Sequence, residues 1–151
     1  MRVYLDLCAL KRPYDQPVQD RIILEALAVA AIVKAFEDHR LDLISSTVLE
    51  LENSKNPQED RRVEVADVLR SIPTTVRSEA RILSRGQELV GLGFRPLDAL
   101  HLACAEQATC DYLVTFDDRL QAAASRAAVQ LRVAVVDPLT LAARLDSEVG
   151  P

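Results

Sequence analysis

Short apolar runs alternate with helical segments along the chain, and this alternation restricts the possible folds more than any other feature. Buried strands are expected at residues 2–5, 41–45, 74–76, 112–116 and 131–136. Helices are expected at residues 20–40, 47–53, 57–71, 78–91, 96–108, 117–128 and 138–145. Apolar strands that alternate with helices pair in parallel and are covered on both faces. The sequence therefore predicts an α/β protein, a three-layer α/β/α sandwich with a mainly parallel central sheet of four to five strands.

The length and composition of the chain suit one domain with a substantial core. Of its 151 residues, 49% are hydrophobic and only 4% are aromatic, so the core must consist mainly of aliphatic side chains. We expect one domain over residues 1–146 and a frayed C-terminal tail over residues 147–151. The formal charge of -5 argues against a protein that coats nucleic acid through a strongly basic surface.

The cysteines and the apolar segments indicate a cytoplasmic protein. Cys8, Cys104 and Cys110 lack the spacing of a zinc site, and free thiols in a reducing cytoplasm are the simplest interpretation. The first residues enter a strand instead of a signal peptide. The longest apolar stretch, residues 22–36, contains charged residues and is too short to span a bilayer. We therefore expect no membrane association.

Four carboxylates stand at the ends of apolar segments. Asp6 and Asp117 each follow a predicted strand, whereas Glu50 and Asp98 lie on helices beside the sheet. The carboxyl ends of parallel strands meet at one edge, where open α/β sheets bind ligands. Carboxylates gathered there repel one another unless a cation joins them, and Mg²⁺ is bound by oxygen ligands of this kind. The sequence thus predicts a Mg²⁺ or Mn²⁺ site and metal-assisted phosphodiester chemistry.

Each of these acids also has a purely structural interpretation. Asp98 and Asp117 could simply be favourable charges at helix N-termini, and Glu50 could be a solvated helix residue. Glu52 is a rival for Glu50, because two residues separated by about 200° around a helix cannot face the same ion. Asp6 is harder to explain structurally, since a charge between two apolar runs is costly unless it is paired or bound to metal.

The order of the four acids resembles that of the PIN-domain family, small ribonucleases that include the toxins of VapC-type toxin–antitoxin pairs. The family has a hydrophobic strand ending in Asp, a Ser/Thr-x-x-Glu-Leu element, an apolar helix led by Asp-Ala, and a Leu-Val-Thr-x-Asp segment. Across roughly residues 2 to 137 this chain has, in the same order, Val3-Tyr4-Leu5-Asp6, Thr47-Val48-Leu49-Glu50-Leu51, Leu97-Asp98-Ala99-Leu100-His101-Leu102-Ala103 and Leu113-Val114-Thr115-Phe116-Asp117.

The resemblance implies a metal-dependent endoribonuclease that hydrolyses RNA phosphodiester bonds, as the toxin of a type II toxin–antitoxin pair. It implies that Asp6, Glu50, Asp98 and Asp117 hold Mg²⁺ or Mn²⁺ and that Thr115 assists them. The partners implied are an RNA substrate, a cognate antitoxin and a second copy in a homodimer. The alternative is a non-catalytic PIN-like module that binds RNA or protein.

Residues close to the acids add further expectations. The family often has Ser or Thr after the first Asp, whereas Leu7 and Cys8 follow it here, and a thiol is a poor ligand for a hard ion. Two interpretations are open for Lys11, Arg12 and Arg21: they could grip RNA phosphates, or they could form local ion pairs in a solvated loop. For His101, in an apolar helix, a hydrogen-bonded position near the core is favoured over a role as general base.

Overall fold

The computed structural model describes residues 1–15 and 19–148, and its strands form one parallel sheet in the order β3-β2-β1-β4-β5. Val3 in the central strand lies opposite Leu43 on one side and Tyr112 on the other. The predicted parallel α/β architecture is confirmed. The strands are β1 (Arg2–Leu5), β2 (Asp42–Ser46), β3 (Thr74–Val76), β4 (Tyr112–Val114) and β5 (Ala134–Val136).

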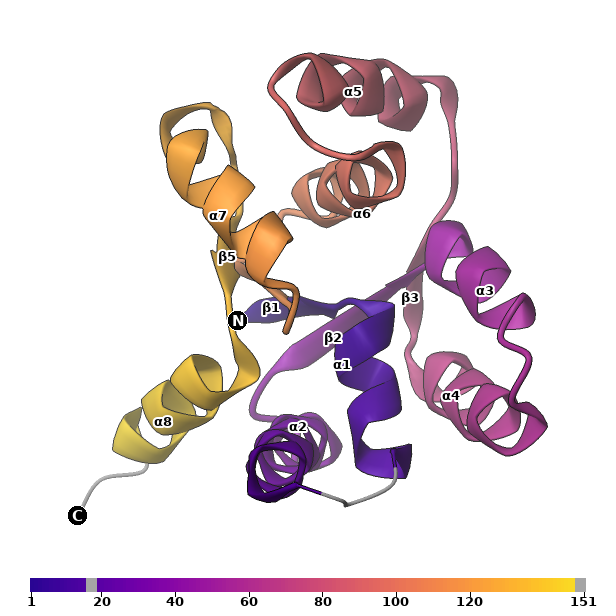
Figure 1. The fold of residues 1–151 in the computed structure, drawn as a ribbon, viewed down its shortest axis with the longest axis vertical. Helices are drawn as coiled ribbons and strands as arrows, with labels where there is room; N and C mark the ends of the chain where they lie inside the picture. The colour runs from indigo at the N-terminus through magenta and orange to yellow at the C-terminus, as the bar shows by residue number, and fades with distance from the viewer. Residues whose placement is uncertain (16–18, 149–151) are drawn as a thin grey trace.

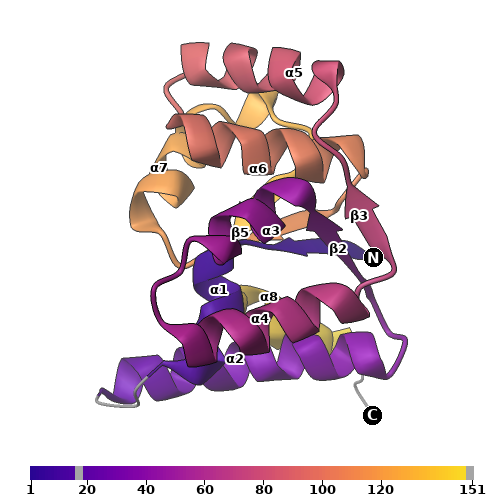
Figure 2. The ribbon, with the colours of Figure 1, turned by 90° about the vertical axis from the view of Figure 1, so that its right-hand side faces the viewer.

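Helices cover both faces of this sheet, which makes the three layers visible in Figure 1 and Figure 2. Figure 1 shows α5, α6 and α7 on one side, and α1, α2, α4 and α8 on the other. The helices are α1 (Leu7–Lys11), α2 (Asp20–Glu37), α3 (Thr47–Ser54), α4 (Glu59–Ser71), α5 (Ala80–Gly91), α6 (Pro96–Gln107), α7 (Asp118–Arg126) and α8 (Pro138–Glu148), with short 3-10 turns at η1 (Arg12–Tyr14) and η2 (Ala128–Gln130).

The core explains why the central strand and α6 are so apolar. Both faces of β1 are covered by helices, and Val3, Tyr4 and Leu5 are at most 2% exposed. Helix α6 is buried from Ala99 over almost its whole length, and its many small residues allow it to pack closely against the sheet. Pro96 starts this helix, as its fixed φ angle favours. The N-terminus of α6 is thereby fixed at the edge of the sheet.

Several boundaries differ from the prediction. The expected loop after the first strand contains α1, whose five residues are too few to show helical periodicity and which Asp6 caps through the N–H of Ala9. Pro17, expected in the same loop, lies outside the described residues. Helix α8 continues through Ser147 to Glu148, past the start of the expected tail, while residues 149–151 lie outside the described residues. The last two predicted strands are shorter than expected.

Within residues 1–15 and 19–148, no helix combines the length and the hydrophobicity needed to cross a membrane.

Candidate metal centre at the carboxyl edge of the sheet

Asp6 lies where β1 ends, and neutral donors hold its side chain. The residue is only 8% exposed, and its Oδ1 accepts hydrogen bonds from the Sγ–H of Cys8 at 2.9 Å and the backbone N–H of Ala9 at 3.1 Å. Burial raises the pKa of Asp6, and the hydrogen bonds offset only part of this effect. Within residues 1–15 and 19–148, no Lys or Arg forms an ion pair with it. Asp6 is therefore a buried carboxylate without a cationic partner in the described part of the chain.

Asp98 and Asp117, in contrast, share a single cation. Asp98 lies in the first turn of α6, and Asp117 caps α7. The Nε of Arg95 donates to Oδ2 of Asp98 at 2.8 Å, and its Nη2 donates to Oδ2 of Asp117 at 2.5 Å. Burial raises the pKa of Asp117, but Arg95 and the backbone donors of α7 outweigh it and lower this pKa overall. The structure thus brings these two acids together around one guanidinium.

Thr115 connects the surroundings of Asp6 with Asp117. It is fully buried, and its Oγ1 accepts the backbone N–H of Asp117 at 3.1 Å. The same oxygen lies 3.6 Å from the Sγ of Cys8, which itself donates to Asp6. The Thr115 hydroxyl also favours the ionised form of Asp6. The residue expected to assist the acids therefore lies between two of them.

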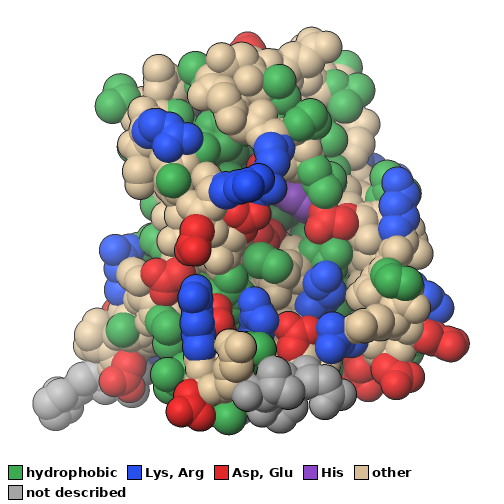
Figure 3. Space-filling model, viewed as in Figure 1, with side chains coloured by type: hydrophobic (Ala, Val, Ile, Leu, Met, Phe, Trp, Pro, Cys, Tyr) green, Lys and Arg blue, Asp and Glu red, His purple; other side chains and the backbone are tan. Residues whose placement is uncertain are grey.

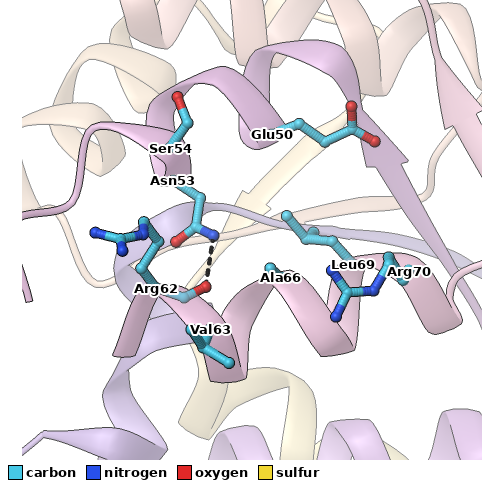
Figure 4. Close-up of a pocket in the computed structure, with 8 residues that line it drawn as sticks. All are labelled: Glu50, Asn53, Ser54, Arg62, Val63, Ala66, Leu69 and Arg70. Atoms are coloured by element: carbon cyan, nitrogen blue, oxygen red, sulfur yellow. Dashed lines mark hydrogen bonds between the residues drawn. The ribbon is translucent and has the colours of Figure 1, made fainter. Parts of the chain in front are cut away.

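Glu50, expected from the Thr47-x-x-Glu50 motif to join this group, has different surroundings in the structure. Glu50 is exposed and lies in a pocket of about 380 Å³ between α3 and α4, opposite Leu69 and Arg70 (Figure 4). Glu52, on the other side of α3, accepts a hydrogen bond from His101 at 2.9 Å. Because His101 follows Asp98 by one helical turn, Glu52 is the α3 carboxylate that faces α6.

The three basic residues predicted to bind RNA have different surroundings. The guanidinium of Arg12 lies 5.0 Å from the ring centre of Phe116, the residue before a site acid. Lys11, at the end of α1, is partly exposed. Arg21 forms an ion pair with Glu25 at 3.3 Å, and Arg12 forms one with Asp15 at 3.2 Å, as the alternative interpretation predicted. Arg12 is therefore the member of this group that contacts a neighbour of the acids.

Two features of this edge were missed in the sequence. Arg95 was not among the predicted site residues, although its position three residues before Asp98 was a signal for an ion pair. Tyr4 was treated only as a strand residue, although it lies on the same face of β1 as Asp6. Figure 3 shows acidic and basic side chains side by side around a histidine in the hollow below α6.

The donor set fits a hard divalent cation in its chemistry. Asp6, Glu52, Asp98 and Asp117 supply carboxylate oxygens, the ligands that Mg²⁺ and Mn²⁺ prefer. Arg95 already shows that two of them attract one cation, and the buried charge of Asp6 has neutral donors only. In residues 1–15 and 19–148, however, no three His, Cys, Asp or Glu side chains lie close enough together to surround one ion. A metal ion at Asp98 and Asp117 would also compete with Arg95 for their oxygens.

Fold and site together define an α/β domain with an acidic carboxyl edge, and the family follows from comparison with known sequences. The sequence model of the PIN domain matches residues 18–126, more than half of the chain. The chain therefore belongs to the PIN-domain family. The match includes Glu50, Glu52, Asp98 and Asp117, whereas Asp6 lies before its first residue.

Comparison with solved structures agrees with this assignment at the level of the fold. The chain is similar to a chain in the crystal structure of VapBC2 from Rickettsia felis bound to a DNA fragment from their promoter. The TM-score is 0.53 at 14% sequence identity, and the similarity covers 91% of this chain and 98% of the other. No curated protein matches the sequence.

Proposed function

We propose that this protein is a Mg²⁺- or Mn²⁺-dependent endoribonuclease whose acids Asp6, Glu52, Asp98 and Asp117 hold the cation. The observation that carries the proposal is the sharing of one guanidinium by Asp98 and Asp117 at the carboxyl edge of the sheet. Two carboxylates held around a positive charge, beside a third that lacks one, form a site that a divalent ion would stabilise. Glu52 replaces Glu50 in this proposal because it faces α6.

A bound divalent ion would supply an activated water and would stabilise charge on the scissile phosphate. The protein contributes fixed ligands. Asp6 is held by the donors of Cys8 and Ala9, and Asp117 is held by the backbone donors at the start of α7. Arg95, once released from its two acids, has donors available for a phosphate oxygen, to which a guanidinium binds well. Thr115 keeps the backbone at Asp117 in place through its hydroxyl.

The biological role that we propose is the toxin of a type II toxin–antitoxin pair, acting in the cytoplasm on RNA as a homodimer controlled by a cognate antitoxin. Membership of the PIN-domain family supports a nuclease. The fold shared with a VapBC2 chain supports an antitoxin as partner, since that protein was solved as a VapBC assembly on promoter DNA.

The second candidate is a non-catalytic PIN-like module that binds RNA or protein. It is favoured by one observation: Arg95 forms ion pairs with both Asp98 and Asp117. If Arg95 remained bound to these acids under all conditions, the domain could keep its fold and act through partners alone. Metal affinity separates the two functions, because a binding module has no need to bind Mn²⁺ tightly.

The test combines calorimetric titration with Mn²⁺ and cleavage of cellular RNA with Mg²⁺ or EDTA, mapped to the nucleotide. In Asp98→Asn we expect Mn²⁺ affinity and cleavage to fall on the order of 100-fold or more, since even outer partners of metal ligands contribute roughly 10- to 100-fold. Asp42→Asn is the matched control, because Asp42 is an exposed acid at the start of β2, at the opposite edge of the sheet. A wild-type protein that neither binds Mn²⁺ nor cleaves RNA would favour the binding module.

A further inference from the structure

A chain of hydrogen bonds runs from the interior of the protein to Glu52. The hydroxyl of Tyr4 lies 2.7 Å from Oγ of Ser46 and 2.6 Å from Nδ1 of His101. The Nε2 of the same imidazole lies 2.9 Å from Oε2 of Glu52. Tyr4 and Ser46 are completely buried and His101 is 3% exposed, whereas a quarter of the Glu52 side chain is exposed. This series of hydrogen bonds therefore begins in the core and ends at the edge of the candidate metal centre.

The acceptors determine the direction of every hydrogen bond in this chain. An ionised carboxylate only accepts, so the Nε2–H of His101 donates to Glu52. In a neutral imidazole the other ring nitrogen, Nδ1, then has no proton, so the Tyr4 hydroxyl donates to it. The Tyr4 oxygen accepts the hydroxyl of Ser46, whose Oγ in turn accepts the backbone N–H of Leu49 at 3.0 Å. With the single imidazole proton on Nε2, each hydrogen bond between Ser46, Tyr4, His101 and Glu52 has one donor and one acceptor.

This arrangement does more than fill the core. A phenylalanine and a leucine could replace Tyr4 and His101 in an apolar environment without polar groups that need partners. The four polar side chains instead connect β1, the end of β2, α6 and α3 through one series of hydrogen bonds. Ser46 also caps α3, the helix that carries Glu52. The position of the helix and the orientation of its carboxylate therefore depend on the same group of side chains.

We propose that His101 is a positioning residue that fixes Glu52 toward the metal, with Tyr4 and Ser46 fixing His101 in turn. The inference deepens the proposed function and rests on it, because Glu52 is a ligand only if the site binds a cation. A carboxylate held by a directed donor binds a metal with less reorganisation than a free one, and such outer partners contribute roughly 10- to 100-fold to affinity.

The matched variants are His101→Asn and His101→Gln. An Asn amide can occupy the place of Nδ1 and meet Tyr4, but it does not reach Glu52. A Gln amide can place its N–H₂ near the position of Nε2 and restore the donor. We expect calorimetric Mn²⁺ affinity to fall about tenfold in His101→Asn and to recover in His101→Gln, with similar thermal stability for both. His39→Asn is the control, because His39 is exposed in the turn that follows α2.

A second measurement tests the direction of the hydrogen bonds without metal. Nitrogen NMR of the wild-type imidazole should show the proton on Nε2, and Tyr4→Phe should lower Mn²⁺ affinity less than His101→Asn because the Glu52 donor remains. A site that loses Mn²⁺ in Asp98→Asn but keeps full affinity in His101→Asn would overturn the positioning role alone. Failure of the wild-type protein to bind Mn²⁺ would overturn the proposed function, and the inference with it.

Discussion

The two sides of the acidic edge differ in how they hold their carboxylates. On the β1 side, Asp6 and Glu52 accept hydrogen bonds from a thiol, a backbone N–H and an imidazole, and Asp6 is almost fully buried. On the β4 side, Asp98 and Asp117 are held by Arg95, whose side chain is half exposed. The first side is held by groups at the edge of the core, whereas the second combines the backbone donors of α7 with a half-exposed guanidinium.

This difference shows which carboxylate a metal ion would stabilise and for which carboxylate it would compete with Arg95. Burial raises the pKa of Asp6, so the ionised form lacks stabilisation that a cation would supply. The pKa of Asp117 is lowered overall, mainly by Arg95, so its charge is already stabilised. A divalent ion bound at this edge would therefore stabilise the charge of Asp6 on the β1 side. On the β4 side it would have to replace the existing ion pair of Asp117 with Arg95.

The largest effect should come from changing the α3 carboxylates one at a time. We expect Glu52→Gln to reduce Mg²⁺-dependent RNA cleavage on the order of 100-fold, because an amide is a weaker metal ligand than a carboxylate. Glu50→Gln should cleave at nearly the wild-type rate, since its side chain lies in the pocket between α3 and α4. The initial rate of cleavage of a labelled RNA measures both variants. The reverse ranking would restore Glu50 as the α3 ligand.

An effect in the opposite direction should follow from removing the guanidinium that Asp98 and Asp117 share. We expect Arg95→Ala to raise Mn²⁺ affinity by roughly threefold to tenfold, because the metal no longer competes with an exposed ion pair worth up to about 1 kcal/mol. RNA cleavage at saturating metal should fall if Arg95 also contacts phosphate.

Calorimetry with Mn²⁺ measures the affinity change, and Arg81→Ala is its control because Arg81 pairs only loosely with Glu79, at 3.6 Å. Unchanged or weakened Mn²⁺ binding in Arg95→Ala would show that the guanidinium does not compete with the metal.

The smallest effects should be on stability without metal, and they should have opposite signs. Asp6→Asn should raise the free energy of unfolding at pH 7 by on the order of 1 kcal/mol, since Asn keeps the cap of α1 and removes a buried charge. Asp117→Asn should lower it by a few tenths to about 1 kcal/mol, because it keeps the cap of α7 and loses the pair with Arg95. Urea unfolding in EDTA measures both.

The dependence on pH follows from the direction of each pKa shift. A carboxyl with a raised pKa in the folded state lowers stability as pH rises through the carboxyl range, so the advantage of Asp6→Asn should disappear in acid. A carboxyl with a lowered pKa contributes stability above its unfolded pKa and loses it as pH falls, so the deficit of Asp117→Asn should also disappear in acid. Unfolding curves recorded from pH 7 to pH 3 would contradict this comparison if both differences kept their size.

Sequence patterns predicted the sheet and the general location of the acids because both depend on short-range features. Apolar runs identify buried parallel strands, and the residue after such a strand must lie at the carboxyl edge, which located Asp6 and Asp117. The predicted hydrogen-bonded histidine near the core is also confirmed, since His101 is buried and has two partners. Whether the acids bind metal stays a prediction.

What the sequence could not supply was the rotation of α3 and the pairing of Arg95 with Asp117. Glu50 and Glu52 lie on different faces of a short helix, and only the packing of α3 beside α6 decides which one faces the site. Arg95 lies 3 residues from Asp98 but 22 residues from Asp117, and the second pairing depends on how α6 and α7 meet at the edge. Local patterns contain neither kind of information.

The buried hydrogen bonds between Tyr4, Ser46, His101 and Glu52 have a consequence for how this protein can vary. Losing one member leaves its neighbour with an unmatched donor or acceptor inside the core, which costs roughly 1–3 kcal/mol. Relatives of this protein are therefore expected to keep or exchange these four positions as a set. A chimera that takes α3 or α6 from a relative should therefore also take the residues that hydrogen-bond to that helix in this set.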